Sequence, residues 1–269
     1  MGVLRVVLLE GGRRRSVVGR GVMRRSTWIA SPANNYRRNI STNHSPSQQS
    51  ANSASVHQKQ PVYELRTYTV YPDKVRDYLK LTADLFHLRT AHSKPLGFWT
   101  TEIGGLNQVV HIWEYESLKH RAGVRARLAG DTEWLGQYVS KAVTMWQQQD
   151  NSLLTLLPGT QLNLPKSTGV YELQTLHMHG GPGVWSRALL EYVRGCEGAC
   201  GGSSVSVGAW GSVLGPLNMV ALLWQHKDQD GYLALSEASH TLKEGTALVP
   251  HITSGHSKLL LPHAVSPLQ

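Results

Sequence analysis

The sequence is poor in the residues that stabilise small secreted proteins or bind structural metal ions. Its 269 residues include only two cysteines, Cys196 and Cys200, which are too few for a disulfide framework. No histidine or second cysteine pair lies near them to complete a zinc site, so we expect no metal site. Neighbouring glycines predict a loop here rather than a helix: Gly195, Gly198, Gly201 and Gly202. We interpret both cysteines as incidental thiols of a protein in a reducing compartment.

Long apolar runs are also missing. The first candidate, residues 3–9, is interrupted by Arg5 and ends before Glu10, whereas a helix that spans a bilayer needs about 20 apolar residues. We therefore expect no transmembrane segment, and the run is also short for a secretory signal.

The sequence contains no phosphate-binding loop, dinucleotide-binding fingerprint, Ser-His-Asp signature or zinc-binding helix. The common enzyme classes therefore have little support. We predict no catalytic residue and no cofactor, and the question of whether the chain is an enzyme stays open.

Acidic residues are almost absent from residues 1–60, which hold ten Lys or Arg residues and only one acid, Glu10. An arginine-rich, serine-rich and acid-poor segment is typical of a mitochondrial presequence, because the inner-membrane potential attracts positive charge. Residues 41–60 are rich in Ser, Gln and Asn and predict a disordered connector. We expect mitochondrial localisation and removal of the leader.

The net charge of +9 does not indicate nucleic-acid binding. Residues 61–269 hold seventeen basic and seventeen acidic residues, whereas a domain that binds a polyanion should carry a basic face of its own. One basic cluster stands out, and we interpret it as the solvated face of a helix: Lys119, Arg121, Arg125 and Arg127. We therefore expect no nucleic-acid partner.

The most informative feature present is a set of motifs that occurs twice, about 108 residues apart. Three motifs return in the same order: VYELRT (62–67) as VYELQT (170–175), LGFW (96–99) as VGAW (207–210), and GGLN (104–107) as GPLN (215–218). Three echoes in one order indicate a duplicated domain. The period is too long for a solenoid, whose units have about 20–50 residues.

The first copy, residues 61–157, predicts the order strand, helix, strand, strand, helices, strand. Strands are expected at 62–71, 96–103, 108–115 and 153–157, and helices from Pro72 to before Pro95, at 117–129 and at 132–149. Gly and Asn in residues 104–107 tolerate the positive φ angles that a hairpin turn requires.

The second copy, residues 170–269, predicts the same order after a linker at 158–169. Its strands are expected near 170–178, 205–213, 219–226 and 257–261, and its helices near 183–194 and 229–253. This order is that of the ferredoxin-like fold. Each such sheet carries helices on one face and leaves the other bare. We therefore predict an α+β protein whose two sheets face each other as a dimeric α+β barrel within one chain, with a possible cavity between them. A further homodimer is possible.

The longer motifs resemble the NIPSNAP family, whose members carry two such domains behind a mitochondrial leader. The matching stretches are 62–68, 87–93, 104–107 and 111–113 in the first half, and 170–173, 215–218 and 266–268 in the second. The likeness covers residues 60–269 and is strongest to the third branch of the family. Residues 195–204 depart from the helical, histidine-containing segment that the family has there.

The resemblance implies a dimeric α+β barrel and association with mitochondria. For some members it also implies roles in vesicle traffic or in marking damaged mitochondria for autophagy. No catalytic motif is established for the family, so none is carried over to this chain.

Two acidic residues, Glu64 and Glu172, occupy the same place in both copies, on strands that are otherwise apolar or aromatic. Arg66 lies on the same strand face as Glu64 and could pair with it. A carboxylate beside a cavity could act as a base or hold a ligand, and a strand-face charge with local partners is the alternative. Gln174 stands in place of the arginine in the second copy, which argues against a symmetric ion pair.

Three histidines are candidates for ligand contacts. His87 and His92 are five residues apart on a predicted helix, which is poor spacing for a shared metal. His111 shares a strand face with Val109 and Trp113. Its counterpart is Leu222, which favours a packing role.

These observations lead to two hypotheses. The first is a mitochondrial binding or adaptor protein for protein partners, with a role in mitophagy or vesicle traffic. The alternative is a small-molecule carrier or a cofactor-free, oxygenase-like enzyme that uses the cavity between the sheets, with the candidate residues as its contacts.

Overall fold

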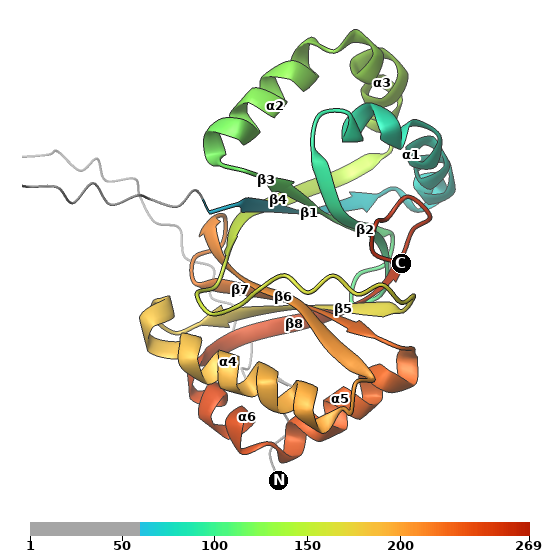
Figure 1. Cartoon of the computed structure of the whole chain (residues 1–269). Coiled ribbons are helices and arrows are strands. Elements are labelled where there is room, and N and C mark those ends of the chain that lie inside the picture. Colours follow the sequence, from blue (N-terminus) through green and yellow to red (C-terminus); the bar gives the residue numbers. More distant parts are fainter. Residues whose placement is uncertain (1–59) are drawn as a thin grey trace, which may run out of the picture. The chain divides into compact units, whose positions relative to one another are not determined.

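The computed structural model describes residues 60–269 (Figure 1). The predicted leader and nearly all of the predicted connector lie outside the described residues. Within residues 60–269, no helix is both long and apolar enough to cross a membrane.

Eight antiparallel strands of the described chain close into a barrel. They are β1 (Val62–Val70), β2 (Lys94–Ile103), β3 (Gln108–Tyr115), β4 (Trp146–Leu156), β5 (Val170–Met178), β6 (Ser204–Leu214), β7 (Met219–His226) and β8 (Ile252–Pro262). Their order around the barrel is β1-β3-β2-β8-β5-β7-β6-β4. The two halves are therefore joined by the β2–β8 and β4–β6 pairs, and closure leaves no unpaired strand edge. The predicted α+β barrel within one chain is confirmed.

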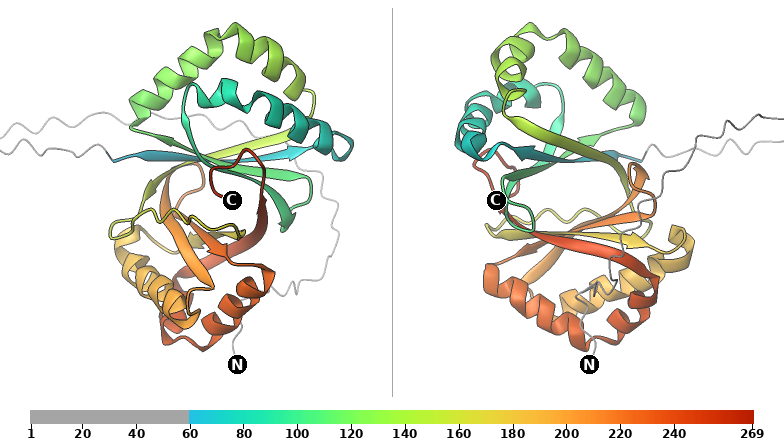
Figure 2. Two further views of the ribbon diagram at one scale, coloured as in Figure 1. Left: turned by 45° about the vertical axis from the view of Figure 1, so that its right-hand side comes forward. Right: turned by 180° about the vertical axis from the view of Figure 1, so that it is seen from behind.

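The helices lie outside the barrel (Figure 2). The first half carries η1 (Pro72–Lys74), α1 (Val75–Thr90), α2 (Leu118–Gly130), the π-helical segment η2 (Trp134–Val139) and α3 (Ser140–Ala142). The second half carries α4 (Pro182–Ala199), α5 (Gln229–Thr241), α6 (Lys243–Leu248) and η3 (Val249–His251). Ser117 caps α2 and Asp228 caps α5, each by accepting a backbone N–H bond at the first turn.

Strand pairing has the same register in both halves. Glu64 lies opposite Trp113, and Glu172 lies opposite Trp224. The register of the β2–β3 pair shifts just before Gly97, and that of the β6–β7 pair shifts just before Gly208. Each of these glycines lies two residues before a tryptophan. The hairpin turns also match the prediction, because Asn107 has φ 60° and its counterpart in the second hairpin has φ 52°.

Apolar and aromatic side chains from all eight strands fill the barrel interior. Trp99 and Trp210 are completely buried there. Because of this packing, the predicted cavity between the sheets is reduced to a hollow of about 160 Å³ at one barrel end, with Thr67, Thr175 and Lys258 among its lining residues. Strand alternation directs Tyr63 and its odd-numbered neighbours on β1 inward, so the even-numbered ones face the helices.

Two predicted helices and the strand that follows each of them have different bounds. The predicted helix 132–149 ends at Ala142, and β4 starts at Trp146 instead of residue 153 because the polar residues 148–151 pair with β1. The predicted helix 229–253 is interrupted at Leu242, where the backbone is extended, and β8 starts at Ile252 to pair with β5. In both places, long-range strand pairing overrides the local pattern.

The loop predicted around the two cysteines is wrong. Helix α4 continues through Gly195 and Gly198 to Ala199, although each glycine costs a helix interior about 1 kcal/mol. Cys196 is completely buried in the apolar cluster between α4 and the second half of the barrel. This packing supports the last turns of the helix, and burial raises the pKa of the Cys196 thiol to about 12.

Candidate functional site

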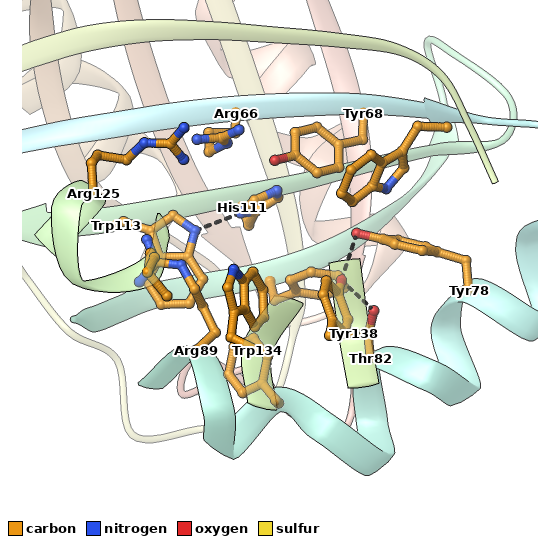
Figure 3. A pocket seen from close by; sticks show the side chains of 14 residues that line it. Arg66, Tyr68, Tyr78, Thr82, Arg89, His111, Trp113, Arg125, Trp134 and Tyr138 are labelled. Atoms are coloured by element: carbon orange, nitrogen blue, oxygen red, sulfur yellow. Dashed lines mark hydrogen bonds between the residues drawn. The ribbon is translucent and has the colours of Figure 1, made fainter. Parts of the chain in front are cut away.

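A cavity of about 60 Å³ lies between the outer face of the first half of the barrel and its helices (Figure 3). Four strands (β1 to β4) and three helical segments (α1, α2 and η2) contribute to its wall. The strand residues are Arg66, Tyr68, Phe98, His111, Trp113 and Trp146, and the helix residues are Tyr78, Thr82, Phe86, Arg89, Arg125, Leu128, Trp134 and Tyr138.

Simple periodicity brings these side chains together. Arg66 and Tyr68 are alternate residues of β1, so both face the helices. Tyr78, Thr82 and Phe86 are four residues apart on α1 and lie on one helix face, which points at the sheet. The cavity is therefore enclosed by one sheet face and one helix face rather than by the two sheets.

The helix side of the cavity contains neutral aromatic groups. Tyr138 donates a hydrogen bond to the Tyr78 hydroxyl (3.3 Å), and Thr82 lies 3.1 Å from the Tyr138 hydroxyl. Burial raises the pKa of Tyr78 and of Tyr138 above the ordinary value, so both phenols stay protonated at physiological pH. Trp134 stacks on Tyr138 with ring centroids 4.5 Å apart.

Glu64 lies beside the cavity and is the centre of a charged network. It is 1% exposed and accepts hydrogen bonds from Arg121 (2.7 and 3.0 Å), Arg66 (3.1 Å), Asn151 (2.7 Å) and Tyr115 (3.2 Å). Burial alone would raise its pKa, but the bonds and charges of these partners outweigh burial and lower the pKa of Glu64 to about 2. The carboxylate is therefore ionised at every physiological pH.

Arg89 is held by contacts of a different kind. Its guanidinium donates to the hydroxyls of Ser93 and of Tyr115, the latter at 3.0 Å. It also lies over the indole of Trp113, 4.0 Å from the ring centroid, in a cation–π contact. Within the described residues, Arg89 thus has no carboxylate in direct contact.

The charges around the cavity do not balance. Four guanidinium groups, those of Arg66, Arg89, Arg121 and Arg125, lie around the cavity and its adjacent network, and Glu64 is the one carboxylate bonded to any of them in residues 60–269. Arg125 is exposed and has no carboxylate partner in that part of the chain. The site therefore has a net positive charge.

His111 is neutral. Burial, with the positive charges of Arg66 and Arg89, holds the pKa of His111 well below its ordinary value. Trp113 Nε1 donates to His111 Nδ1 at 2.6 Å, so the ring proton lies on Nε2. Nε2 has no hydrogen-bond partner in the described chain. The imidazole also meets the Tyr68 ring edge-to-face, with centroids 4.8 Å apart.

Neither His111 nor Glu64 is placed to act as a general base. A general base needs a free lone pair and a pKa near the working pH. His111 has its lone pair on Nδ1 occupied by Trp113, and the carboxylate of Glu64 is saturated with donors and holds its charge down to about pH 2.

The predicted site residues fall into two groups. Glu64, Arg66 and His111 lie together at the cavity, and the predicted Glu64–Arg66 pair is present. His87 is exposed on α1, and His92 lies in the following turn, where its Nε2 is 2.7 Å from a carboxylate oxygen of Asp131.

Glu172 belongs to the second half and lies apart from the cavity. It is 2% exposed and accepts bonds from Gln174 (2.9 Å) and Ser257 (2.5 Å). A further neighbour is His226, whose Nε2 is 3.5 Å from the carboxylate. Glutamine has thus taken the position of the arginine beside the acid, as the sequence comparison of the halves indicated.

Sequence reasoning missed the arginines on α1 and α2. The cluster at residues 119–127 was interpreted as a solvated face, which needs correction because Arg121 binds Glu64 and Arg125 lines the cavity. The available signal was the four-residue spacing of these two arginines, which places them on one side of the helix.

The pKa of Glu64 predicts loss of stability in acid. Its folded pKa of about 2 lies below the ordinary 4.5, so the ionised group stabilises the fold above pH 4.5, and this contribution is lost as the pH falls from 4.5 to 2. The expected loss is on the order of 3 kcal/mol. Denaturant unfolding of the full chain across this range measures it. In a Glu64→Gln variant this part of the pH dependence should disappear, and its persistence would contradict the assigned pKa.

Comparison with known proteins identifies related sequences. The NIPSNAP family model matches residues 63–160. Protein NipSnap homolog 3B of Mus musculus is 35% identical over 213 residues, covering 77% of this chain and 85% of that protein. Protein NipSnap homolog 3A of Homo sapiens has the same identity, 35% over 213 residues, with 77% and 85% covered.

A solved structure from Fusobacterium nucleatum, whose name describes it as a candidate monooxygenase, is similar in fold. Its TM-score is 0.58, covering 76% of this chain and 93% of that chain, at 12% sequence identity. A likeness at this identity shows the fold alone.

Proposed function

The chain belongs to the NIPSNAP family, and on that premise we propose that it binds a small molecule in the cavity between β1, β3 and the helices α1 and η2. The proposal rests on one observation. An aromatic-walled cavity lies beside a cluster of arginines, and buried polar groups of its wall lack hydrogen-bond partners within the described residues. Arg66 Nε and His111 Nε2 are buried without a hydrogen-bond partner in residues 60–269. Buried polar groups are normally paired, and a ligand with acceptor atoms could supply the partners after a small side-chain movement.

The proposed site differs from the predicted one in position. The carrier hypothesis places the ligand between the two sheets, but the side chains of Trp99 and Trp210 fill most of the barrel interior. The enzyme hypothesis needs a proton acceptor, and neither Glu64 nor His111 has the free lone pair and pKa for that role. We therefore propose binding without acid–base catalysis.

Native mass spectrometry of the protein, purified from eukaryotic mitochondria, tests the proposal. We expect a retained small molecule in the wild-type protein and its loss in Thr82→Leu, because the larger side chain would occupy the cavity. Thr90→Leu is the matched control, since Thr90 is on the same helix but does not line the cavity. Circular dichroism would establish that both variants are folded. A ligand retained equally by all three proteins, or by none, would contradict binding at this site.

A mitochondrial adaptor role for protein partners, in mitophagy or vesicle traffic, stays a second proposal. The composition of residues 1–60 and the family likeness support it. A further support is the exposure of Leu106 (76%) and Leu217 (85%), which lie at the turns of the two hairpins. The turn at Asn107 is hydrogen-bonded to the end of β1, and the turn at Asn218 is hydrogen-bonded to the end of β5. Because β1 and β5 are four places apart in the antiparallel barrel, they run in the same direction, and the two turns lie at the same barrel end. Proximity labelling in cells that recovered no partner above a matched mitochondrial control would contradict this role.

We also infer that the two halves descend from one duplicated ferredoxin-like unit. The repeated motifs, the identical strand registers and the paired positive-φ asparagines support this inference. A comparison of the two halves across relatives of the chain tests it. If halves from those relatives shared neither motifs nor registers, the inference would be wrong.

A further inference from the structure

The arginines at the cavity differ in how many of their donors are already used. Arg121 gives Nε and Nη2 to Glu64, and Arg89 gives both terminal nitrogens to hydroxyl groups. Arg66 gives Nη1 to Glu64 and lies over the Tyr68 ring, 5.1 Å from its centroid, while its Nε is buried without a hydrogen-bond partner in residues 60–269. Arg125 is exposed and lines the cavity. Two guanidinium groups, those of Arg66 and Arg125, thus keep donors for a ligand (Figure 3).

These two groups also lack a counter-charge of their own. Arg66 shares Glu64 with Arg121, and no acidic residue of the described chain contributes to the cavity wall. Like charges that line one small cavity repel each other, and the repulsion is larger where water is partly excluded. An anion placed between Arg66 and Arg125 would remove this repulsion. A guanidinium fork binds a planar carboxylate with two parallel bonds.

The remainder of the cavity sets the size and polarity of the ligand body. Its walls include the rings of Phe98, Trp134 and Trp146, which favour an apolar body. A volume of about 60 Å³ is less than half of the roughly 150 Å³ cavity that accepts benzene in an engineered protein. The space therefore suits a chain of a few carbon atoms and excludes an aromatic ring.

We propose that the ligand is a short-chain aliphatic carboxylate, with its carboxylate between Arg66 and Arg125 and its alkyl chain in the aromatic cavity. This inference rests on the proposed small-molecule binding and specifies the chemical class of the ligand. Inorganic phosphate would meet the same arginines but has no apolar part to occupy the cavity.

Isothermal titration of the full chain with butanoate and with butanamide separates charge from shape. The two probes have nearly the same size, and only butanoate carries a charge. We expect butanoate to bind about tenfold more tightly, because hydrogen bonds to charged groups are stronger. Across the series from ethanoate to hexanoate, affinity should rise about fourfold for each added methylene group until the chain fills the cavity, and then stop rising.

Two variants locate the carboxylate. Arg125→Gln should lower butanoate affinity about tenfold, to the level of butanamide. Arg127→Gln, the same charge change on the same helix but outside the cavity, should leave it unchanged. An equal loss of butanoate affinity in both arginine variants, or equal affinity of the protein for butanoate and butanamide, would overturn the carboxylate assignment. In either case, loss of binding of both probes in Thr82→Leu would still support binding in the cavity. If neither probe bound, the assignment would be overturned, and retention of another ligand in native mass spectrometry would show whether the proposed function survives.

Discussion

Replacing Glu64 by glutamine is expected to lower the free energy of unfolding by about 3–5 kcal/mol. The carboxylate is 1% exposed and is the shared counter-ion of Arg66 and Arg121. Glutamine keeps the size of the side chain but removes its charge, so two guanidinium groups lose their counter-ion in a partly buried site. Their desolvation is then no longer offset by attraction. Urea unfolding at neutral pH, followed by circular dichroism, measures the change.

The second half of the chain provides a matched control for this prediction. Glu172 occupies the equivalent position and is equally buried, but Gln174 and Ser257 are neutral partners. Glu172→Gln should therefore cost only about 1 kcal/mol, the net value of a typical hydrogen bond. Adding Arg121→Gln to Glu64→Gln should recover part of the loss, because one unpaired charge is removed. Equal losses for the two glutamate variants would show that the arginine network is not the cause.

Replacing Gly97 by alanine is expected to lower the free energy of unfolding by about 3 kcal/mol. A Cβ atom at residue 97 would lie 2.0 Å from Cη2 of Trp99, far inside van der Waals contact. The indole cannot move aside easily, because it is completely buried in the barrel interior. A register irregularity in the β2–β3 pairing lies just before Gly97. Thermal and urea unfolding of the variant measure the effect.

Two further glycines serve as comparisons. Gly208 has the same relation to Trp210, with a closest approach of 2.6 Å, so Gly208→Ala should also destabilise the protein. Gly183 is exposed on α4, and in the described chain an added Cβ would meet no atom within 4 Å beyond its own chain neighbours and helix backbone. Gly183→Ala should stabilise the helix by about 0.5–1 kcal/mol. If Gly97→Ala behaved like Gly183→Ala, the close approach of the indole would be disproved.

The repeated LGFW and VGAW motifs have a structural reason that only the barrel reveals. From the sequence, the shared glycine and tryptophan indicated that the two halves are related. The structure shows that each glycine is required because its own strand folds an indole back over the backbone. The motif can thus be found in the sequence, but the contact that requires its glycine depends on packing inside the closed barrel.

Several features followed from the sequence alone. Residue alternation predicted β1 and β5, Gly and Asn predicted both hairpin turns, and the order of elements predicted a barrel formed within one chain. The motifs of the first and second halves identified the family. These properties depend on backbone preferences and on residues close together in the chain, so local patterns carry them.

Other features were decided by the tertiary structure. The early start of β4 depends on pairing with β1, and the last turns of α4 depend on burial of Cys196. The position of the cavity depends on how side chains of β1, β3, α1 and α2 fill the space between sheet and helices. Arg121 and Glu64 are 57 residues apart, and no local pattern links them. Their contact exists because the helix crosses the sheet at that point, where burial makes the pairing of charges energetically decisive.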